Sequence, residues 1–439
     1  MRQLILKVQS FLILLVLVSA NVQAQKSPVD MDRFIDDLMK RMTLEEKIGQ
    51  LNLLPGGDIV TGKEMDSPLA QLTREGKLGA VLSLRDPVKI KALQQIAVKK
   101  SRLGIPLLFG YDVIHGFQTV LPIPLAQACS WDTTAIRRGA EMAARECTSQ
   151  GIDWVYSPMV DIALDPRWGR IAEGNGEDPF LGSCIAKVMV EGLQGNYGPE
   201  NAMACLKHYA LYGAVEAGRD YNTVDMSHVR MYNQYFPPYE AAVRAGVGSV
   251  MSSFNLVDGI PATANPWLIH DVLRQQWGFD GFLVTDYGSI GEMVIHGVGD
   301  LAACSAAALK SGTDMDMCSN AYSAHLLQLV KEGKVREADI DQACRRVLEA
   351  KYKLGLFQNP YRFLNSKRAK TALYTPGHRA MAREIAAETF VLLKNEGDIL
   401  PLKREGTIAL IGPLANDRSN MVGSWSTADT SQKCLPVYS

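Results

Sequence analysis

An excess of charge of either sign is missing from this 439-residue sequence, whose 46 Lys and Arg residues nearly balance 47 Asp and Glu residues. The basic residues are scattered along the chain and form no stripe. A chain of this kind gives no electrostatic reason to bind a polyanion or an anionic membrane surface. We therefore expect no nucleic-acid partner.

Long apolar runs are also scarce, and the one at the N-terminus is too short to cross a membrane. Arg2 and Lys7 precede the apolar run at 11–18, and small residues follow it up to Ala24. This order is typical of a secretory signal peptide, whereas a spanning helix needs about 20 apolar residues. We predict a signal peptide over 1–24 and a soluble mature chain without a membrane anchor, located in the periplasm or secreted.

Cysteine motifs that hold metals are absent. There is no CxxC pair and no Cys/His spacing of the kind that binds zinc, and most of the cysteines fall within apolar patterns. Disulfides are the alternative for an exported chain. We expect buried free thiols, because unpaired cysteine is among the most buried residue types. The eight positions are 129, 147, 184, 205, 304, 318, 344 and 434.

What is present between about residues 30 and 356 is an alternation of apolar runs and amphipathic helical stretches. Thr43 and Glu46 form the pattern of a capping box, and Gly151 and Gly312 follow two of the predicted helices, 137–150 and 304–311. Runs that are apolar on both faces, each followed by a helix, indicate a parallel sheet covered by helices. The predicted strands are 78–84, 105–111, 154–160, 202–207, 248–254, 282–286 and 313–317.

The number of these units favours an α/β fold of the (β/α)8 barrel type, with an open doubly wound sheet as the alternative. Polar residues favour the barrel, because they fall at the C-terminal ends of successive apolar runs, where a barrel has its active site. They are Asp112, Asp161, the pair 207–208, the pair 252–253 and Asp286.

The chain is predicted to continue beyond the barrel. We assign 25–357 to the barrel and 358–405 to a linker and helix. Residues 406–439 read as the beginning of a second α/β sandwich domain, opened by a strand at 407–411. So few residues do not complete a domain, and we expect this domain to be truncated in the given sequence.

Three segments carry candidate chemistry. In the first, an apolar run delivers Asp286 to the barrel mouth before a glycine-containing turn; an N-cap role for this Asp is the structural alternative. The second, 165–178, is rich in Arg, Trp and carboxylates, which suit sugar hydroxyls and sugar faces but also suit internal ion pairs. In the third, Lys207 and His208 could clamp hydroxyl groups, although His208 could also be a core histidine.

Seven motifs in order resemble those of family-3 glycoside hydrolases, most of all periplasmic bacterial β-glucosidases. The resemblance runs from about residue 30 to the C-terminus. The motifs are YDVIHG at 111–116, SPMVDI at 157–162, DPRWGR at 165–170, CLKHY at 205–209, YNTVD at 221–225, MSSFN at 251–255 and VTDYG at 284–288.

The resemblance implies a retaining hydrolase that releases terminal β-D-glucosyl residues from an oligosaccharide or β-glucoside through a glycosyl-aspartate intermediate. It places the nucleophile on Asp286 and implies neither a metal nor an organic cofactor. Met251 stands where some members have an aromatic residue in the sugar site. The residues that match the family's glucose-binding set are Asp112, Arg167, Lys207, His208 and Asp220.

The second carboxyl group of such an enzyme, its general acid, is not assigned by the sequence. In the β-glucosidase branch it usually comes from the second domain or a loop near it; by residue type alone the candidates here are Glu173, Glu177, Asp178 and Glu216. The N-acetylglucosaminidase branch instead uses a His in the loop after the Lys-His motif. Residues 209–220 contain no His, which disfavours that branch.

The nucleophile must be ionised, and we expect nearby cations such as Arg167 and Lys207 to lower the pKa of Asp286. Two other functions stay open: a Schiff-base lyase that uses Lys207, and a sugar-binding barrel or fragment that is inactive because it lacks the acid. The sequence also allows a homo-oligomer.

Overall fold

The computed structural model describes residues 28–57 and 68–427, so the predicted signal peptide (1–24) and Cys434 lie outside the described residues. The chain divides into two units, the first ending at Arg41 and the second beginning at Met42. Helix α2 (Pro28–Met39) is the described helix of the first unit. Among the residues that the structure describes, no helix is both long enough and apolar enough to cross a membrane.

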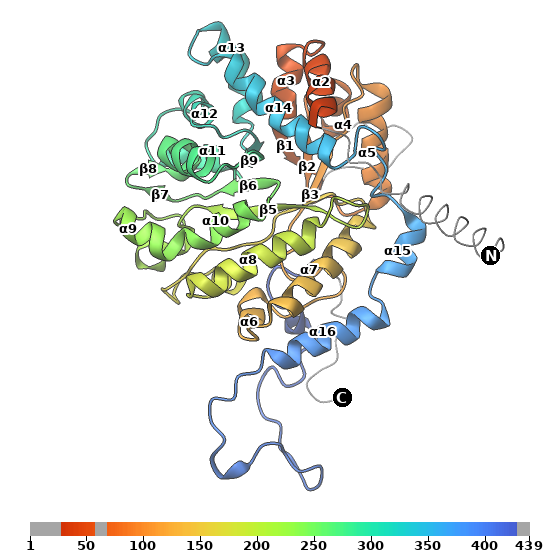
Figure 1. Cartoon of the computed structure of the whole chain (residues 1–439), viewed down its shortest axis with the longest axis vertical. Helices are drawn as coiled ribbons and strands as arrows, with labels where there is room; N and C mark the ends of the chain where they lie inside the picture. Colours follow the sequence, from red (N-terminus) through yellow and green to blue (C-terminus); the bar gives the residue numbers. More distant parts are fainter. Residues whose placement is uncertain (1–27, 58–67, 428–439) are drawn as a thin grey trace, which may run out of the picture. The chain divides into compact units, whose positions relative to one another are not determined.

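The second unit is built around a parallel sheet that closes into a barrel (Figure 1). In the described part of the chain the sheet has eight strands, in the order β10-β1-β2-β3-β4-β5-β6-β9. A parallel bridge between Val284 and Met315 joins its two ends. This closure confirms the predicted (β/α)8 barrel and excludes the open doubly wound sheet. The strands are β1 (Asn52–Pro55), β2 (Ala80–Leu82), β3 (Leu108–Tyr111), β4 (Trp154–Val155), β5 (Met203–Tyr209), β6 (Ser249–Ser252), β9 (Phe282–Val284) and β10 (Asp316–Met317).

Helices connect successive strands, and further helices follow β10 (Figure 1). The α-helices are α3 (Leu44–Gln50), α4 (Pro68–Arg74), α5 (Pro87–Lys100), α6 (Pro124–Ala128), α7 (Thr133–Thr148), α8 (Pro179–Gln194), α9 (His228–Arg230), α10 (Pro237–Arg244), α11 (Ser289–Ile295), α12 (Leu301–Lys310), α13 (Ala321–Lys331), α14 (Glu337–Lys353), α15 (Ser366–Ala372) and α16 (Pro376–Glu388). Two π-helices, η5 (Met231–Tyr235) and η7 (Trp267–Gln276), and a hairpin of β7 (Leu256–Val257) and β8 (Ile260–Pro261) complete the connections around β6.

Local signals in the sequence account for several helix ends. The Thr43 hydroxyl accepts from the Glu46 amide (3.2 Å) while the Glu46 carboxylate accepts from the Thr43 amide (3.0 Å), which confirms the predicted capping box. Gly151 and Gly312 follow α7 and α12 with φ of +97°, a left-handed conformation that glycine adopts without the steric cost of a Cβ. Strand β1 was not predicted, because four residues directly after a helix give too short a pattern.

Large aromatic side chains fill the inside of the barrel. The rings of Trp154 on β4 and Phe282 on β9 lie 5.1 Å apart, although these strands are not neighbours in the sheet. The Trp154 indole N–H is not left unpaired, because it donates to the Ser249 hydroxyl (2.8 Å). The barrel is therefore a packed core whose polar residues are available at its rims.

The segment after the barrel differs from the prediction. Helix α16 packs on α7 through buried Ile385, which belongs to one apolar cluster with Leu121, Ala135 and Met142. The strand predicted at 407–411 is wrong: these residues have no strand structure, and Ile408 and Ile411 are 65% and 90% exposed. A strand of this kind needs a hydrogen-bonded neighbour, and the described residues contain none that pairs with it.

The cysteines agree with the expectation of free thiols. All seven that the structure describes are unpaired, and Cys147, Cys205, Cys304 and Cys344 are buried. Cys129 is exposed, so the prediction of burial does not hold for it.

Candidate active site

The polar residues at the strand ends gather at one rim of the barrel because parallel strands all finish at the same edge. Asp112 follows β3, Lys207 and His208 lie near the end of β5, and Asp286 follows β9. The structure brings these four residues together. The β5–β6 ladder is irregular between Leu206 and Tyr209, the stretch that carries Lys207 and His208.

The two carboxylate oxygens of Asp286 differ in their hydrogen bonding within the described residues. Its Oδ1 accepts the backbone amide of Tyr287 (2.7 Å). Its Oδ2 is buried and accepts no hydrogen bond from the residues that the structure describes; it lies 3.5 Å from His208 Nε2 and 3.8 Å from Arg170 Nη1. Burial raises the pKa of Asp286 to about 6, against the opposing effect of Arg170 and Lys207. The expectation of a lowered pKa is wrong because burial outweighs the neighbouring cations.

Arg170 is the guanidinium that lies beside Asp286. It forms a two-pronged ion pair with Glu173 (2.8 and 3.0 Å), and its Nη2 also donates to His208 Nε2 (2.9 Å). Although burial opposes the charged forms of both partners, their pairing raises the pKa of Arg170 and lowers the pKa of Glu173. Glu173 therefore carries a negative charge and serves as the fixed partner of Arg170.

His208 is fully buried and held from both sides. Its Nδ1 and its backbone amide both lie against Asp161 Oδ2 (2.8 and 2.9 Å). The other Asp161 oxygen accepts the Tyr239 hydroxyl (2.6 Å). Burial, together with Arg170 and Lys207, keeps the pKa of His208 well below its usual range. The imidazole is consequently neutral.

Lys207 and Asp112 form a second charged pair at the rim, with 2.8 Å between Nζ and Oδ1. The Lys207 side chain is buried and that of Asp112 is 21% exposed. The indole ring of Trp425, far along the chain, lies 5.6 Å from Lys207 Nζ. Trp425 also contributes a hydrogen bond to Glu173, so both charged pairs at the rim contact this residue.

Residues 423–427 are fastened to the loops that follow β2 and β3. Ser424 O lies 2.5 Å from His115 Nε2, and the Thr427 hydroxyl donates to Phe117 O (2.6 Å). Arg85 donates to Thr427 O. These contacts hold Trp425 at the rim. No pattern in the sequence around Trp425 indicates that it lies at the barrel.

Three residues that the resemblance implied have other neighbours among the described residues. Arg167 is 69% exposed and pairs with Asp165 (2.6 Å). Asp220 accepts from the Trp168 indole (3.0 Å). Met251 is buried on β6, in register with Val284. The arginine beside Asp286 is Arg170, and its spacing of three residues from Glu173 is the signal that could have distinguished it from Arg167.

The four acid candidates do not gain support from the structure. Glu173 is engaged with Arg170. Asp178 caps α8 by accepting the Leu181 amide (2.7 Å). Glu177 and Glu216 are exposed.

Ser252 and Ser253, the other polar residues at a strand end, are fully buried. Ser252 hydrogen-bonds the Thr263 hydroxyl (2.8 Å), and Ser253 donates to Ala210 O (3.2 Å). They serve the packing of the barrel wall. No cluster of metal-binding side chains occurs in 28–57 or 68–427.

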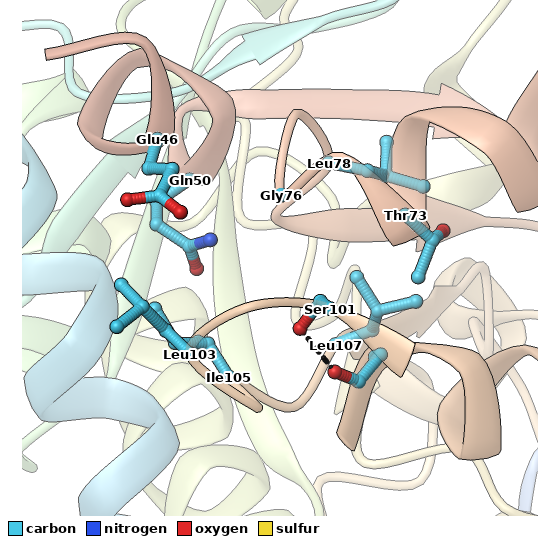
Figure 2. Close-up of a pocket in the computed structure, with 10 residues that line it drawn as sticks. Glu46, Gln50, Thr73, Gly76, Leu78, Ser101, Leu103, Ile105 and Leu107 are labelled. Atoms are coloured by element: carbon cyan, nitrogen blue, oxygen red, sulfur yellow. Dashed lines mark hydrogen bonds between the residues drawn. The ribbon is translucent and has the colours of Figure 1, made fainter. Parts of the chain in front are cut away.

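A separate cavity lies at the amino-terminal ends of β1–β3 (Figure 2), away from the polar cluster. Its polar side chains already have partners. Thr73 donates to Leu69 O (2.6 Å), Ser101 donates to Ala97 O (2.5 Å) and Gln50 accepts from Lys351 (2.6 Å). The cavity therefore offers few free groups to a ligand, and we place the candidate site at the opposite rim.

Comparison with known proteins defines the family. Residues 43–350 match the glycosyl hydrolase family 3 N terminal domain, and the chain therefore belongs to glycoside hydrolase family 3.

Its relatives are larger glycosidases. A periplasmic β-glucosidase of Salmonella typhimurium is 43% identical over 94% of this chain and 54% of its own length. A β-xylosidase of Formosa agariphila is 35% identical over 80% of this chain and 52% of its own length. The crystal structure of a β-glucosidase from Listeria innocua in complex with glucose matches with a TM-score of 0.87 and 41% identity, over 92% of this chain and 58% of that one. The chain spans about half the length of the curated relatives it matches.

Proposed function

We propose that the protein is a retaining β-glucosidase whose nucleophile is Asp286. The observation that carries this proposal is the buried Oδ2 of Asp286 at the barrel mouth, to which none of the described residues donates a hydrogen bond. A nucleophile needs a free lone pair, and this oxygen has one in a setting where most other buried polar atoms are paired.

In the proposed reaction, Asp286 Oδ2 attacks the anomeric carbon of a β-glucoside while the bond to the leaving oxygen breaks. The leaving oxygen takes a proton from a general acid, and a glycosyl ester of Asp286 forms. Water then adds to the anomeric carbon, its proton goes to the same group, and Asp286 is released. Two inversions at one carbon give a β-configured product.

Asp112, Lys207 and Arg170 are proposed to hold the sugar hydroxyls, and His208 is proposed to act on the sugar site through Arg170, which donates to its Nε2. Charged hydrogen-bonding groups of this kind strengthen their interactions as the sugar ring flattens in the transition state. Arg170 takes the role that the resemblance implied for Arg167. Met251 and Asp220 stay proposed as members of the wall around the sugar.

The alternative of a Schiff-base lyase is weak because it requires an unpaired Lys207. The Lys207 ammonium is held by Asp112 at 2.8 Å. A non-catalytic sugar-binding protein is distinguished by experiment, since it would bind glucose without turning over any aryl glycoside.

The nucleophile is tested by trapping. A 2-deoxy-2-fluoro-β-glucoside with a good leaving group should add one sugar to the peptide that contains Asp286, as seen by mass spectrometry of the full-length protein. Asp286→Asn should stay unlabelled, whereas the matched control Asp258→Asn, at an exposed position outside the site, should label like the wild type. A sugar on another carboxylate would contradict the assignment.

The relatives support a proposal for the substrate and for the location. We propose glucose rather than xylose at the site because the most similar of the relatives named above is a β-glucosidase. A higher kcat/KM for aryl β-glucoside than for aryl β-xyloside is expected. We also propose export to the periplasm after cleavage behind Ala24, for which sequencing of the mature N-terminus should give Gln25 first.

A further inference from the structure

The tautomer of His208 follows from its partners. Arginine is only a donor, so His208 Nε2, at 2.9 Å from Arg170 Nη2, must accept. The single ring hydrogen of the neutral imidazole is then on Nδ1, where it is donated to Asp161 Oδ2 at 2.8 Å.

This tautomer matters for the oxygen of Asp286. His208 Nε2 is 3.5 Å from Asp286 Oδ2. A hydrogen on Nε2 would face two groups at once: it would oppose an N–H of Arg170 and be offered to the free oxygen of Asp286. The Nδ1–H tautomer avoids both, holding Arg170 in place and leaving Oδ2 without a donor.

Asp161 supplies what this tautomer needs. It is fully buried and accepts three hydrogen bonds, from the amide and Nδ1 of His208 and from the Tyr239 hydroxyl. The neighbouring backbone fixes its place, because the Val160 amide donates to Lys207 O (2.8 Å) and thereby ties the Asp161 segment to β5.

We propose that Asp161 is a positioning residue for the reaction: by fixing the Nδ1–H tautomer of His208, it keeps Arg170 beside Asp286 and keeps Asp286 Oδ2 free to attack. This inference rests on the proposed function, since it assigns Asp161 a part in that same site.

Tyr239 makes the inference testable with near-isosteric changes. In Asp161→Asn, the amide oxygen can still accept from His208 if the amide NH2 points to Tyr239. The Tyr239 hydroxyl can then accept that N–H and turn its own hydrogen to His208 O, which lies 2.8 Å away. In Tyr239→Phe alone, the carboxylate of Asp161 still accepts from His208. Only the double variant loses both the charge and the group that orients the amide.

The experiment is a double-mutant cycle on an aryl β-glucoside. We expect kcat/KM to fall within about threefold for Tyr239→Phe and within about tenfold for Asp161→Asn. The kcat/KM of the double variant should be at least tenfold lower than the product of the two single effects predicts, because the effects of mutating groups in contact are not additive. A matched control is Asp153→Asn, another fully buried Asp that accepts a backbone amide, from Phe109 at 2.8 Å. It should stay within about twofold in kcat/KM whatever it does to stability.

A second readout does not depend on activity. In ¹⁵N NMR of histidine-labelled protein, with the His208 signal assigned by its loss in His208→Gln, the wild type should show hydrogen on Nδ1 and a bare Nε2. The double variant should show hydrogen on Nε2 in part of the molecules. An additive cycle, or a wild-type His208 with hydrogen on Nε2, overturns the role of Asp161. A wild type that turns over no glycoside overturns the proposed function instead, and the NMR result still decides the tautomer.

Discussion

Neutralising Asp286 should stabilise the protein while it abolishes turnover. The carboxyl group has a pKa of about 6 in the folded protein against an ordinary value of 3.8, because burial disfavours its charge. The difference of about two units corresponds to ~3 kcal/mol, since each unit is worth about 1.4 kcal/mol. The side chain is only 13% exposed, so solvent screens little of this cost.

The stability gained by Asp286→Asn should increase with pH. Between pH 3.8 and about 6 the folded protein binds a proton at Asp286 that the unfolded chain has released, so wild-type stability falls as the pH rises through this window. Asp286→Asn removes the group that titrates. We therefore expect it to be more stable than the wild type by about 2–3 kcal/mol at pH 8, with a smaller gain at pH 5 and the smallest, ~0.5 kcal/mol, at pH 4.

Urea unfolding followed by tryptophan fluorescence at pH 4, 5, 6.5 and 8 measures this difference. The matched control is Asp165→Asn, because the half-buried Asp165 has its pKa lowered to about 2, chiefly by hydrogen bonds from Arg167, and should show no stabilisation at pH 8. Equal or lower stability of Asp286→Asn at pH 8 would refute the reasoning. It would mean that attraction to Arg170 and Lys207 outweighs the cost of burial.

Three further predictions concern the rim of the barrel and helix α16. Arg170→Lys should lower kcat/KM about 100-fold, because a lysine cannot hold the two-pronged pair, whereas Arg167→Lys should change it less than threefold; similar losses in both would contradict the assignment. The kcat/KM of the wild type should rise tenfold per unit below pH 6 and level off above it as Asp286 ionises, and a flat profile from pH 4.5 to 7 would speak against Asp286 as nucleophile. Glu146→Ala should release α16, because the buried Glu146 carboxylate accepts from the Tyr374 amide and from His378 (2.9 and 2.8 Å). Limited digestion with trypsin should then cut within 366–388 faster than in the wild type. Glu141→Ala, on the exposed face of α7, is the control.

Most of the barrel strands and the candidate site at their C-terminal ends could be predicted because both follow from short-range patterns. Runs that are apolar on both faces give parallel strands, and parallel strands present their last residues at one edge. This is why Asp112, Lys207, His208 and Asp286 could be expected to lie together at one rim.

What the sequence could not predict depends on contacts between distant residues. The choice between Arg167 and Arg170 is made by how one loop folds back on β5. The raised pKa of Asp286 comes from burial, which no local pattern reveals. The segment at 407–411 has the apolar, β-branched composition of a strand, but among the described residues it has no neighbour with which to pair.

The rim of the barrel is shared between two stretches that are more than 300 residues apart, since Thr427 and Ser424 bond to Phe117 and His115. The binding of a ligand that contacts both Lys207 and Trp425 is therefore coupled to the docking of the segment at 423–427 on these loops. The free energy with which the docked segment favours such a ligand must equal the free energy with which the ligand favours docking. At a ligand concentration 100 times its Kd, a ligand that binds only the docked form would stabilise that form by about 2.7 kcal/mol. A ligand at the rim would thus hold the segment at 423–427 against the loops that follow β2 and β3 for as long as it is bound.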